Sequence, residues 1–461
     1  MNRRTFIRTS TAAVASGALA NSLSGSSHSE QTPNILFIMT DQQHSGMMSC
    51  TGNTLLSTPA LDQLAAEGVR FENAYASNPV CVPSRMSMAT GMMPARLGAL
   101  DDSGTKVKRL PKEAAQHSMG KLMKAAGYDT FYGGKTHLSP ELIPNQNSGY
   151  DTYFKDQREQ LPKACVEFIS EKRDRPFFAV ASFINPHDIC YAYNAYKKRE
   201  KMMPGVNELY EQASKIPLDE LPPLPDNFEI PGLEPDAIAA NSKITAVTPS
   251  KIMREEYDER EWRMYRWIYC RLTEEVDGHI GQILDGLKAC EQENNTLVVF
   301  ISDHGDMDAS HGLASKGVMY EESVHVPLII RHPKSLAPGT VDPSLVNIGI
   351  DLLPTFCDFA GVTIPKHLLG RSLRSKEAPP LYVASENHWS RMIRTERFKY
   401  CAYKEGHHKE SLVNLQADPG EMINLAGDEK YENELQKHRN HLKDWVKLSE
   451  DSHGIEYFAS A

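Results

Sequence analysis

One cysteine of the chain lies beside residues that could make it reactive. Cys81 begins the segment Cys-Val-Pro-Ser-Arg, and residues 86–90 after it can begin a helix. A helix N-terminus stabilises an anion next to it, and Arg85 could hold the cysteine as a thiolate. A single cysteine is nevertheless more often a packed apolar group. The segment alone leaves both interpretations open, so the rest of the chain has to decide between them.

Acidic and imidazole side chains follow two apolar runs of strand length, 34–40 and 296–302. Asp41 follows the first run, and Asp303-His304 follow the second. In an open α/β sheet the carboxyl ends of the strands meet at one ligand crevice. Two carboxylates, an imidazole and the amide that follows Asp41 could hold one divalent cation there. Each aspartate considered singly could instead cap a helix.

The elements that would position these residues form a recurring pattern. Apolar runs of strand length alternate with helix-compatible stretches, and the runs are 34–40, 128–132, 177–183, 296–302 and 326–330. Such alternation predicts a doubly wound α/β sheet of buried parallel strands. Polar residues gather at the strand ends, where the ligand crevice is expected.

Two other stretches are expected around this sheet. Residues 257–288 carry apolar side chains at three- and four-residue spacings, which predicts a long amphipathic helix whose role is packing. Residues 202–250 are Pro-rich and irregular, which predicts a long surface insertion. It would lie near a substrate mouth or wrap the surface without a function.

The pattern changes past about residue 375. Short strand-like pieces and then a charged helix are expected at 381–385, 398–403 and 431–447. They predict a smaller C-terminal α+β unit. We therefore divide the chain into a leader (1–30), a main domain (31–375) and a C-terminal subdomain (376–461).

The N-terminus has the features of an export signal. Arg3-Arg4 precede Phe6, and a weakly apolar, Ala-rich stretch from Thr9 closes on Ala-Leu-Ala at Ala20. This pattern predicts a twin-arginine-type signal and a periplasmic or secreted protein. A disordered tail with chance arginines is the alternative. No other run approaches the ~20 apolar residues that cross a bilayer, so no membrane segment is expected after processing.

Composition limits the partners and the covalent framework. The formal net charge is −10 and the isoelectric point is near 6.0, whereas nucleic-acid binding needs concentrated Lys and Arg. No nucleic-acid partner is therefore expected. The eight cysteines form no C-x-x-C pair, and their spacing predicts no disulfide pairing.

Several segments together resemble a known family. Cys-x-Pro-Ser-Arg at 81–85, followed by Ala-Thr-Gly at 89–91, resembles the signature of the type I sulfatases in the alkaline phosphatase superfamily. Residues 127–137, with Lys135 and His137, resemble the second signature of that family, and 34–41 resemble its first strand and metal aspartate. Further matching motifs follow in order: Asn185-Pro186-His187, Asp303-His304-Gly305, His311-Gly312 with Lys316, 320–327, and Asp418-Pro419-Gly420-Glu421 with Asn424-Leu425. The resemblance implies an alkaline-phosphatase-like, doubly wound mixed sheet flanked by helices, with a C-terminal subdomain of small antiparallel sheet and helix.

The resemblance also implies a modified residue and a metal ion. In this family the signature cysteine becomes formylglycine (3-oxoalanine), so Cys81 is expected to be modified by a formylglycine-generating or anaerobic sulfatase-maturating enzyme. Asp41, Gln42, Asp303 and His304, with the residue at 81, are expected to surround Ca²⁺, or else Mg²⁺ or Mn²⁺. Gln42 and His304 depart from the commoner Asp and Asn, and they partly resemble the choline-sulfatase, iduronate-sulfatase and phosphonate-hydrolase branches.

The reaction that the resemblance implies is hydrolysis of a sulfate monoester. Hydrated formylglycine is expected to attack sulfur, with Arg85, Lys135 and Lys316 opposing the charge of the sulfate. His187 with Lys316 is expected to protonate the leaving alcohol. His137 is expected to remove the proton of the second hydroxyl when the enzyme-bound sulfate is expelled.

The expected substrate is an O-sulfate of a sulfated carbohydrate, released during polysaccharide breakdown, by analogy with the family. Two alternatives are a phosphonate monoester or phosphodiester hydrolase, favoured by Gln42 and His304, and a non-catalytic protein that binds sulfated glycans and keeps Cys81 intact. The candidates for stacking on or clamping the sugar are Tyr191, Tyr193, Trp262, Trp389 and Arg391.

Overall fold

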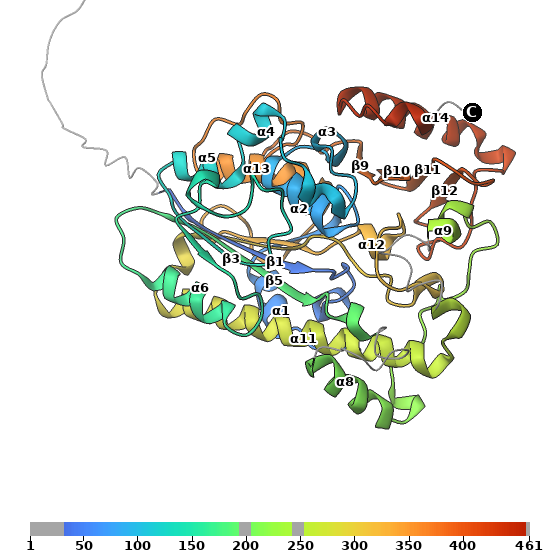
Figure 1. Cartoon of the computed structure of the whole chain (residues 1–461), viewed down its shortest axis with the longest axis horizontal. Coiled ribbons are helices and arrows are strands. Elements are labelled where there is room, and N and C mark those ends of the chain that lie inside the picture. Colours follow the sequence, from blue (N-terminus) through green and yellow to red (C-terminus); the bar gives the residue numbers. More distant parts are fainter. Residues whose placement is uncertain (1–31, 193–203, 242–252, 458–461) are drawn as a thin grey trace, which may run out of the picture. The chain divides into compact units, whose positions relative to one another are not determined.

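An eight-stranded mixed sheet forms the centre of the fold (Figure 1). The computed structural model describes residues 32–192, 204–241 and 253–457. The strand order is β4-β3-β5-β1-β6-β7-β2-β8. The bounds are β1 (Asn34–Asp41), β2 (Val69–Tyr75), β3 (Asp129–Gly134), β4 (Thr152–Phe154), β5 (Phe177–Pro186), β6 (Thr296–Ser302), β7 (Leu328–Arg331) and β8 (Thr340–Asn347). The predicted fold class is confirmed, with β1 parallel to both of its neighbours, β5 and β6.

Helices cover both faces of this sheet (Figure 1). One layer contains α1 (Pro59–Glu67), α6 (Leu161–Ser170) and α11 (Glu259–Ala289), and the other contains α2 (Cys81–Thr90), α5 (Met119–Ala125) and α13 (Ile348–Phe359). Alternate residues of β1 point to opposite layers, as strand geometry requires. Leu36 and Ile38 pack with the α11 side, whereas Ile35 and Phe37 pack with the α13 side. Both faces are therefore buried, which explains the continuous apolar runs.

Some strands differ from the sequence prediction. β7 is antiparallel to both β6 and β2, so the run at 326–330 is not a parallel strand. β2 and β8 were not predicted because exposed polar residues interrupt them, as in the burial pattern of Val69–Tyr75. β4 has only three residues, which is too short for a periodic signal.

The C-terminal part contains a second sheet and a covering helix (Figure 1). This antiparallel sheet has the order β12-β11-β10-β9, with bounds β9 (Tyr382–Glu386), β10 (Ser390–Thr395), β11 (Phe398–Tyr403) and β12 (Glu410–Asn414). Leu435 and Leu442 of α14 (Glu432–Leu448) pack on it in one apolar cluster with Ile393 and Tyr400. This agrees with the predicted small antiparallel sheet and helix. The domain boundary at 375/376 stays a prediction, because both sheets belong to one compact unit.

The Pro-rich insertion is more regular than predicted. Its described part contains α8 (Pro204–Lys215) and α9 (Asp236–Asn241). Val206 and Ala213 of α8 join an apolar cluster with Trp262 and Ile268 of α11. Val206 and Ala213 are two helical turns apart, so they lie on the same face of α8 and pack together. The prolines of the segment had made it look irregular.

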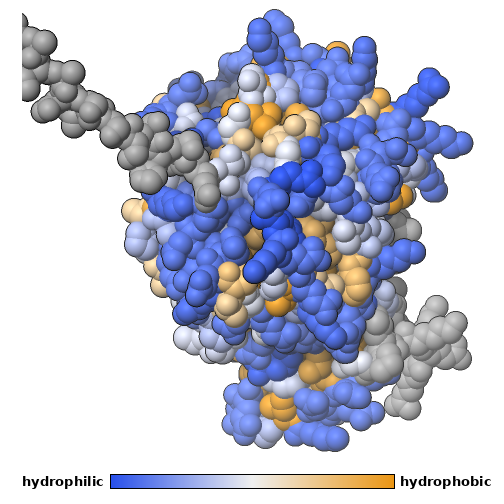
Figure 2. Space-filling view, turned by 90° about the vertical axis from the view of Figure 1, so that its left-hand side faces the viewer, coloured by the Kyte–Doolittle hydropathy of each residue, from blue (hydrophilic) through white to orange (hydrophobic). Residues whose placement is uncertain are grey.

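The remaining helices are short. They are α3 (Pro94–Leu97), α4 (Lys112–Gln116) and α12 (Glu321–Val324). No helix of the described ranges is long and apolar enough to cross a membrane. Figure 2 shows one face of the molecule, on which hydrophilic side chains predominate and hydrophobic ones are scattered in small groups.

Candidate active site

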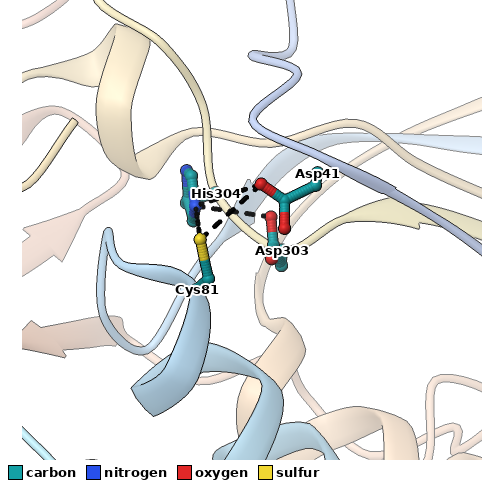
Figure 3. A group of neighbouring side chains, drawn as sticks. All are labelled: Asp41, Cys81, Asp303 and His304. Carbon is teal, nitrogen blue, oxygen red and sulfur yellow. Dashed lines mark hydrogen bonds and ion pairs between the residues drawn. The ribbon is translucent and has the colours of Figure 1, made fainter. Parts of the chain in front are cut away.

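The predicted reactive residues come together at the carboxyl ends of the central strands. Asp41 is the last residue of β1, and Asp303 and His304 follow β6 directly. Lys135 follows β3, and Cys81 is the first residue of α2. Figure 3 shows Cys81 at the end of its helix, pointing toward Asp41, Asp303 and His304. The topology therefore brings together residues that are up to 263 positions apart, from Asp41 to His304.

Cationic and imidazole groups surround the sulfur of Cys81. Its Sγ lies 2.9 Å from Lys316 Nζ, 3.2 Å from His304 Nε2 and 3.7 Å from Lys135 Nζ. Burial and Asp41 oppose ionisation, but Lys135, Lys316 and His304 hold the pKa of the Cys81 thiol well below its usual range. The position therefore favours negative charge, as a site for a sulfate or a nucleophile requires.

Arg85 holds carboxylates and makes no hydrogen bond to Cys81. Its Nε donates to Asp303 Oδ2 at 2.6 Å, and its Nη2 donates to Asp41 Oδ2 at 2.8 Å. Nη1 donates to Ser182 Oγ at 2.7 Å and to the Lys135 carbonyl at 3.1 Å. Arg85 interacts with Cys81 electrostatically and without a hydrogen bond, so its stabilisation of a thiolate stays a prediction. Its fixed fork sets the distance between the two carboxylates.

The two carboxylates, Cys81 and His304 fit a divalent cation. One ligand atom from each of Asp41, Cys81, Asp303 and His304 lies within 4.8 Å of all the others, and all four residues are buried. Burial raises the pKa of Asp303 above its usual range in spite of Arg85. Burial lowers and Asp303 raises the pKa of His304, with a net rise. Both shifts favour the protonated forms of Asp303 and His304, as expected where buried carboxylates lie close together without a cation.

The orientation of His304 supports the same conclusion. Its Nδ1 lies 2.9 Å from the Gly305 carbonyl, which can only accept a hydrogen bond, so Nδ1 carries a proton. Nε2 then offers its lone pair toward Asp303 Oδ1 at 3.6 Å and Asp41 Oδ1 at 3.9 Å. A ligating histidine whose other nitrogen is held by a carbonyl is a common arrangement at metal sites.

The two remaining histidines lie differently around Cys81. His187 is mostly buried and shares a hydrogen bond with Cys81. Burial, with Lys316 and Lys135, lowers the pKa of His187 to about 4. His137 is exposed, has a positive φ of 45°, and makes no hydrogen bond or ion pair to Cys81 among the residues that the structure describes. Its role as a base stays a prediction.

Gln42 bridges Lys316 to a buried carboxylate that the sequence motifs left without a role. Lys316 Nζ donates to Gln42 Oε1 at 2.7 Å, and Gln42 Nε2 donates to Asp306 Oδ2 at 2.6 Å. An ammonium only donates and a carboxylate only accepts, so the two partners determine the orientation of the amide. Asp306 also accepts from Tyr265 OH at 2.9 Å. Tyr265 belongs to α11, which therefore supports the site as well as packing on the sheet.

Two predicted sugar contacts are wrong. Trp262 is 2 % exposed in an apolar cluster, and Arg391 is 1 % exposed with its Nε 2.6 Å from Asp451 Oδ2. Both are core residues and cannot reach a sugar. Tyr191 and Trp389 are partly exposed, and Tyr193 lies outside the described residues.

Comparison with known proteins gives the family. The Sulfatase family model matches residues 33–362. The chain belongs to the sulfatase family. It is 30 % identical over 92 % of its length to the Δ4,5-hexuronate-2-O-sulfatase of Bacteroides thetaiotaomicron, of which 91 % is covered. The N-acetylglucosamine-6-O-sulfatase of the same organism is 26 % identical, with 91 % of this chain and 87 % of the relative covered.

The solved structure of a 2-O GAG sulfatase is also similar, with a TM-score of 0.79 and 28 % identity. The match covers 92 % of this chain and 94 % of that structure. The protein is therefore a sulfuric ester hydrolase. The alternative of a non-catalytic glycan-binding protein finds no support in these relatives.

The bridge from Gln42 to Lys316 gives the first testable prediction for this sulfatase. Gln42→Ala is expected to lower kcat/KM for sulfate ester hydrolysis about 10–100-fold, because Lys316 loses the oxygen that directs it to Cys81. Gln43→Ala is the matched control. Gln43 is equally buried but bonds Thr40 and the Met47 carbonyl. Calorimetric titration with Ca²⁺ checks the alternative, since a large loss of cation affinity in Gln42→Ala would make Gln42 a ligand instead.

His311, in the segment between Asp303 and Lys316, gives a prediction of pH dependence. It is fully buried and stacks on Tyr320 with ring centroids 3.9 Å apart, and neither ring nitrogen has a partner among the described residues. Burial lowers the pKa of His311 to about 4. The unfolded chain takes up this proton near pH 6.5, so the contribution to stability is complete above that pH and is lost toward pH 4.

His311→Asn is expected to remove roughly 3 kcal/mol of the decrease in unfolding free energy between pH 7 and pH 4, and asparagine tolerates the φ of 55° at this position. Urea unfolding at both pH values measures it. The exposed His453→Asn is the control and should follow the wild type. Equal pH dependence in all three proteins would contradict the assignment.

Proposed function

We propose that this sulfatase removes an O-sulfate from a sulfated carbohydrate, using formylglycine formed from Cys81 and a divalent cation. The observation that carries the proposal is the position of Cys81, whose Sγ lies 2.9 Å from Lys316 Nζ at the start of α2 and beside Asp41, Asp303 and His304. The names of its relatives, a hexuronate-2-O-sulfatase and an N-acetylglucosamine-6-O-sulfatase, support the substrate class.

The residues of this chain would bind and orient the sulfate. A formylglycine hydrate would supply a hydroxyl nucleophile and allow release of the sulfate without attack of water on sulfur. Lys316 Nζ and Lys135 Nζ, which converge on the atom at position 81, would oppose the negative charge of the sulfate oxygens. Because these groups are buried, their attraction for an anion is stronger than in water.

A cation would be held by Asp41, Asp303, His304 and the residue at 81, and would polarise the sulfate oxygens. Oxygen and imidazole ligands suit Ca²⁺, Mg²⁺ or Mn²⁺. Arg85 would keep the two carboxylates in place through its Nε and Nη2, which bond the Oδ2 atoms of Asp303 and Asp41.

His187 would give a proton to the leaving oxygen. Its low pKa in the free site follows from burial and from the two lysines, and an anionic ester bound beside it would raise that pKa. The imidazole could then hold a proton in the substrate complex and donate it when the ester bond breaks. His137, on the exposed side, would accept the proton of the second hydroxyl.

Export and maturation complete the proposal. The twin-arginine-type N-terminus supports a periplasmic or secreted location. Cys81 is 1 % exposed, and Val82, Pro83, Ser84 and Arg85 are buried with it. A formylglycine-generating or anaerobic sulfatase-maturating enzyme would therefore act on this segment before the chain folds, hence before export of a folded protein.

The test uses the protein from a host that contains such a maturating enzyme. Mass spectrometry of the peptide around Cys81 should find formylglycine. The mature protein should release sulfate from at least one of an unsaturated 2-O-sulfated hexuronate disaccharide, N-acetylglucosamine 6-O-sulfate and related sugars. EDTA should abolish release, and Ca²⁺, Mg²⁺ or Mn²⁺ should restore it.

One aryl ester and the state of Cys81 serve as controls for the chemistry. Hydrolysis of 4-nitrophenyl phenylphosphonate without release from any sugar sulfate would replace the proposal by a phosphonate hydrolase. Full sulfate release by protein that retains an unmodified Cys81 thiol would overturn the formylglycine part.

A further inference from the structure

One carboxylate close to Cys81 has no part in the chemistry above. Asp102 is the first residue of the 3₁₀ turn η2 (Asp102–Lys106). It accepts a hydrogen bond from the backbone N–H of Val82, in the first turn of α2, and interacts electrostatically with Cys81, Lys316 and His137. Unlike Cys81 and Lys316, Asp102 is exposed to solvent. It therefore faces the reaction centre from the open side.

The turn that carries Asp102 is packed firmly on α2. The preceding residue, Asp101, caps the turn by accepting from Ser103 N at 2.8 Å. Gly104 leaves no room for a side chain, since a Cβ there would come within 3.0 Å of Val82 Cγ1 and 2.9 Å of Ala99 Cβ. The two adjacent aspartates thus have separate tasks. Asp101 holds the turn, and Asp102 points to the start of α2.

The carboxylate of Asp102 makes no ion pair with any described residue and accepts from the Val82 N–H alone among the described contacts. A carboxylate has room for several donors, so most of its hydrogen-bonding capacity is unused. Lys316 and His137 attract this carboxylate electrostatically, but neither forms an ion pair with it. An anion without an ion-pair partner is unexpected at a site that binds sulfate, because it repels the substrate. Such a group improves binding only if it meets a donor that the substrate brings.

The alcohol part of a sulfate ester extends from the buried sulfate toward solvent. Near Cys81 the exposed residues that it would pass include Asp102 and His137. We propose that Asp102 is a specificity-determining residue that accepts a hydrogen bond from a sugar hydroxyl next to the sulfate ester. This inference rests on the proposed function, since it concerns the sugar that the same site would bind.

The charge of Asp102 would favour one kind of sugar substituent and disfavour another. A neighbouring hydroxyl gains a hydrogen bond to a charged acceptor, which is stronger than one between neutral groups. A carboxylate or second sulfate at the same place is repelled. An aryl sulfate, which has no hydroxyl to offer, experiences only the repulsion of its own sulfate.

The experiment compares Asp102→Ala and Asp102→Asn with Asp101→Asn, a neighbouring variant that keeps the cap of the turn. The substrates are the sugar sulfate that the wild type hydrolyses fastest and 4-nitrophenyl sulfate. For the sugar, Asp102→Ala should lower kcat/KM about 10–100-fold and Asp102→Asn by less, because the amide is a neutral acceptor. For 4-nitrophenyl sulfate both variants should raise kcat/KM a few-fold. Asp101→Asn should follow the wild type with both substrates.

Opposite changes in kcat/KM for the two substrates would show that Asp102 recognises the sugar and does not take part in sulfate transfer. An equal loss for both would mean that Asp102 acts in sulfate transfer or only holds α2, and it would overturn the inference. No change for either would overturn it as well.

A binding measurement separates this inference from the proposed function. If the mature wild type releases sulfate from no sugar, the proposed substrate class fails. Affinities for the same sugar sulfates and for 4-nitrophenyl sulfate are then measured calorimetrically in Cys81→Ala protein with and without Asp102→Ala. Weaker sugar binding with tighter aryl sulfate binding supports the role of Asp102, and unchanged or tighter binding of every sugar sulfate refutes it.

Discussion

Cys81→Ala is expected to lower kcat for sulfate release by a factor on the order of 10⁵, with KM changed much less. Removing a nucleophile leaves only binding and the preorganised charges of the site, and comparable deletions in other hydrolases cost a similar factor. The charges remain because Lys316, Lys135 and His304 are held by contacts besides that to Cys81. Inorganic sulfate release under saturating substrate, with mature protein as reference, measures the effect.

Cys165→Ala is the matched control for this prediction. Cys165 is a fully buried free thiol of α6, and burial raises its pKa to about 12. It packs among apolar residues, so its loss should reduce stability modestly and leave kcat unchanged. The pKa values of these two buried thiols shift in opposite directions. We therefore expect loss of Cys81 to lower kcat and loss of Cys165 to affect only stability. Residual turnover by Cys81→Ala within tenfold of the wild type would refute a nucleophile at this position.

That the active-site residues lie close together could be predicted from the sequence, because this depends on the order and direction of the strands. Asp41 and Asp303 follow continuous apolar strands, and any parallel pairing of those strands places both carboxylates at one edge. Cys81, Lys135 and Lys316 came from motifs, and the structure brings all of them within 4 Å of Asp41. The position of each group could thus be predicted without knowing any side-chain contact.

Contacts between side chains could not be predicted in the same way. Arg85 looked like a partner of its neighbour Cys81, but its guanidinium hydrogen-bonds Asp41 at the end of β1 and Asp303 just after β6. Tyr265 lies in the helix for which only a packing role was predicted, since periodicity reports the buried face of a helix and not the hydroxyl at the tip of a buried tyrosine. β6 and β7 are likewise both continuously apolar, and this pattern is the same for parallel and antiparallel pairing.

Arg85→Ala is expected to destabilise the protein by about 3–5 kcal/mol and to weaken cation binding about 10–100-fold. The first effect follows because two buried carboxylates lose their common partner, each at a distance below 3 Å. The second follows because groups that orient ligating carboxylates contribute this much to metal affinity. Arg85→Lys should recover only part of either quantity, since an ammonium cannot replace the planar fork. Urea unfolding and calorimetric Ca²⁺ titration measure the two effects separately.

Arg391→Ala separates a loss of stability from a loss of the site. Arg391 is 1 % exposed, and its guanidinium bonds Asp451 and backbone carbonyls of the C-terminal sheet. Its removal should reduce stability by a similar amount and leave Ca²⁺ affinity unchanged. If both variants lost Ca²⁺ affinity equally, the loss would reflect a loosened fold. The two arginines differ in the carboxylates that they hold, and only Arg85 holds Asp41 and Asp303. A loss of Ca²⁺ affinity in Arg85→Ala alone would therefore show that Arg85 sets the spacing of these two carboxylates.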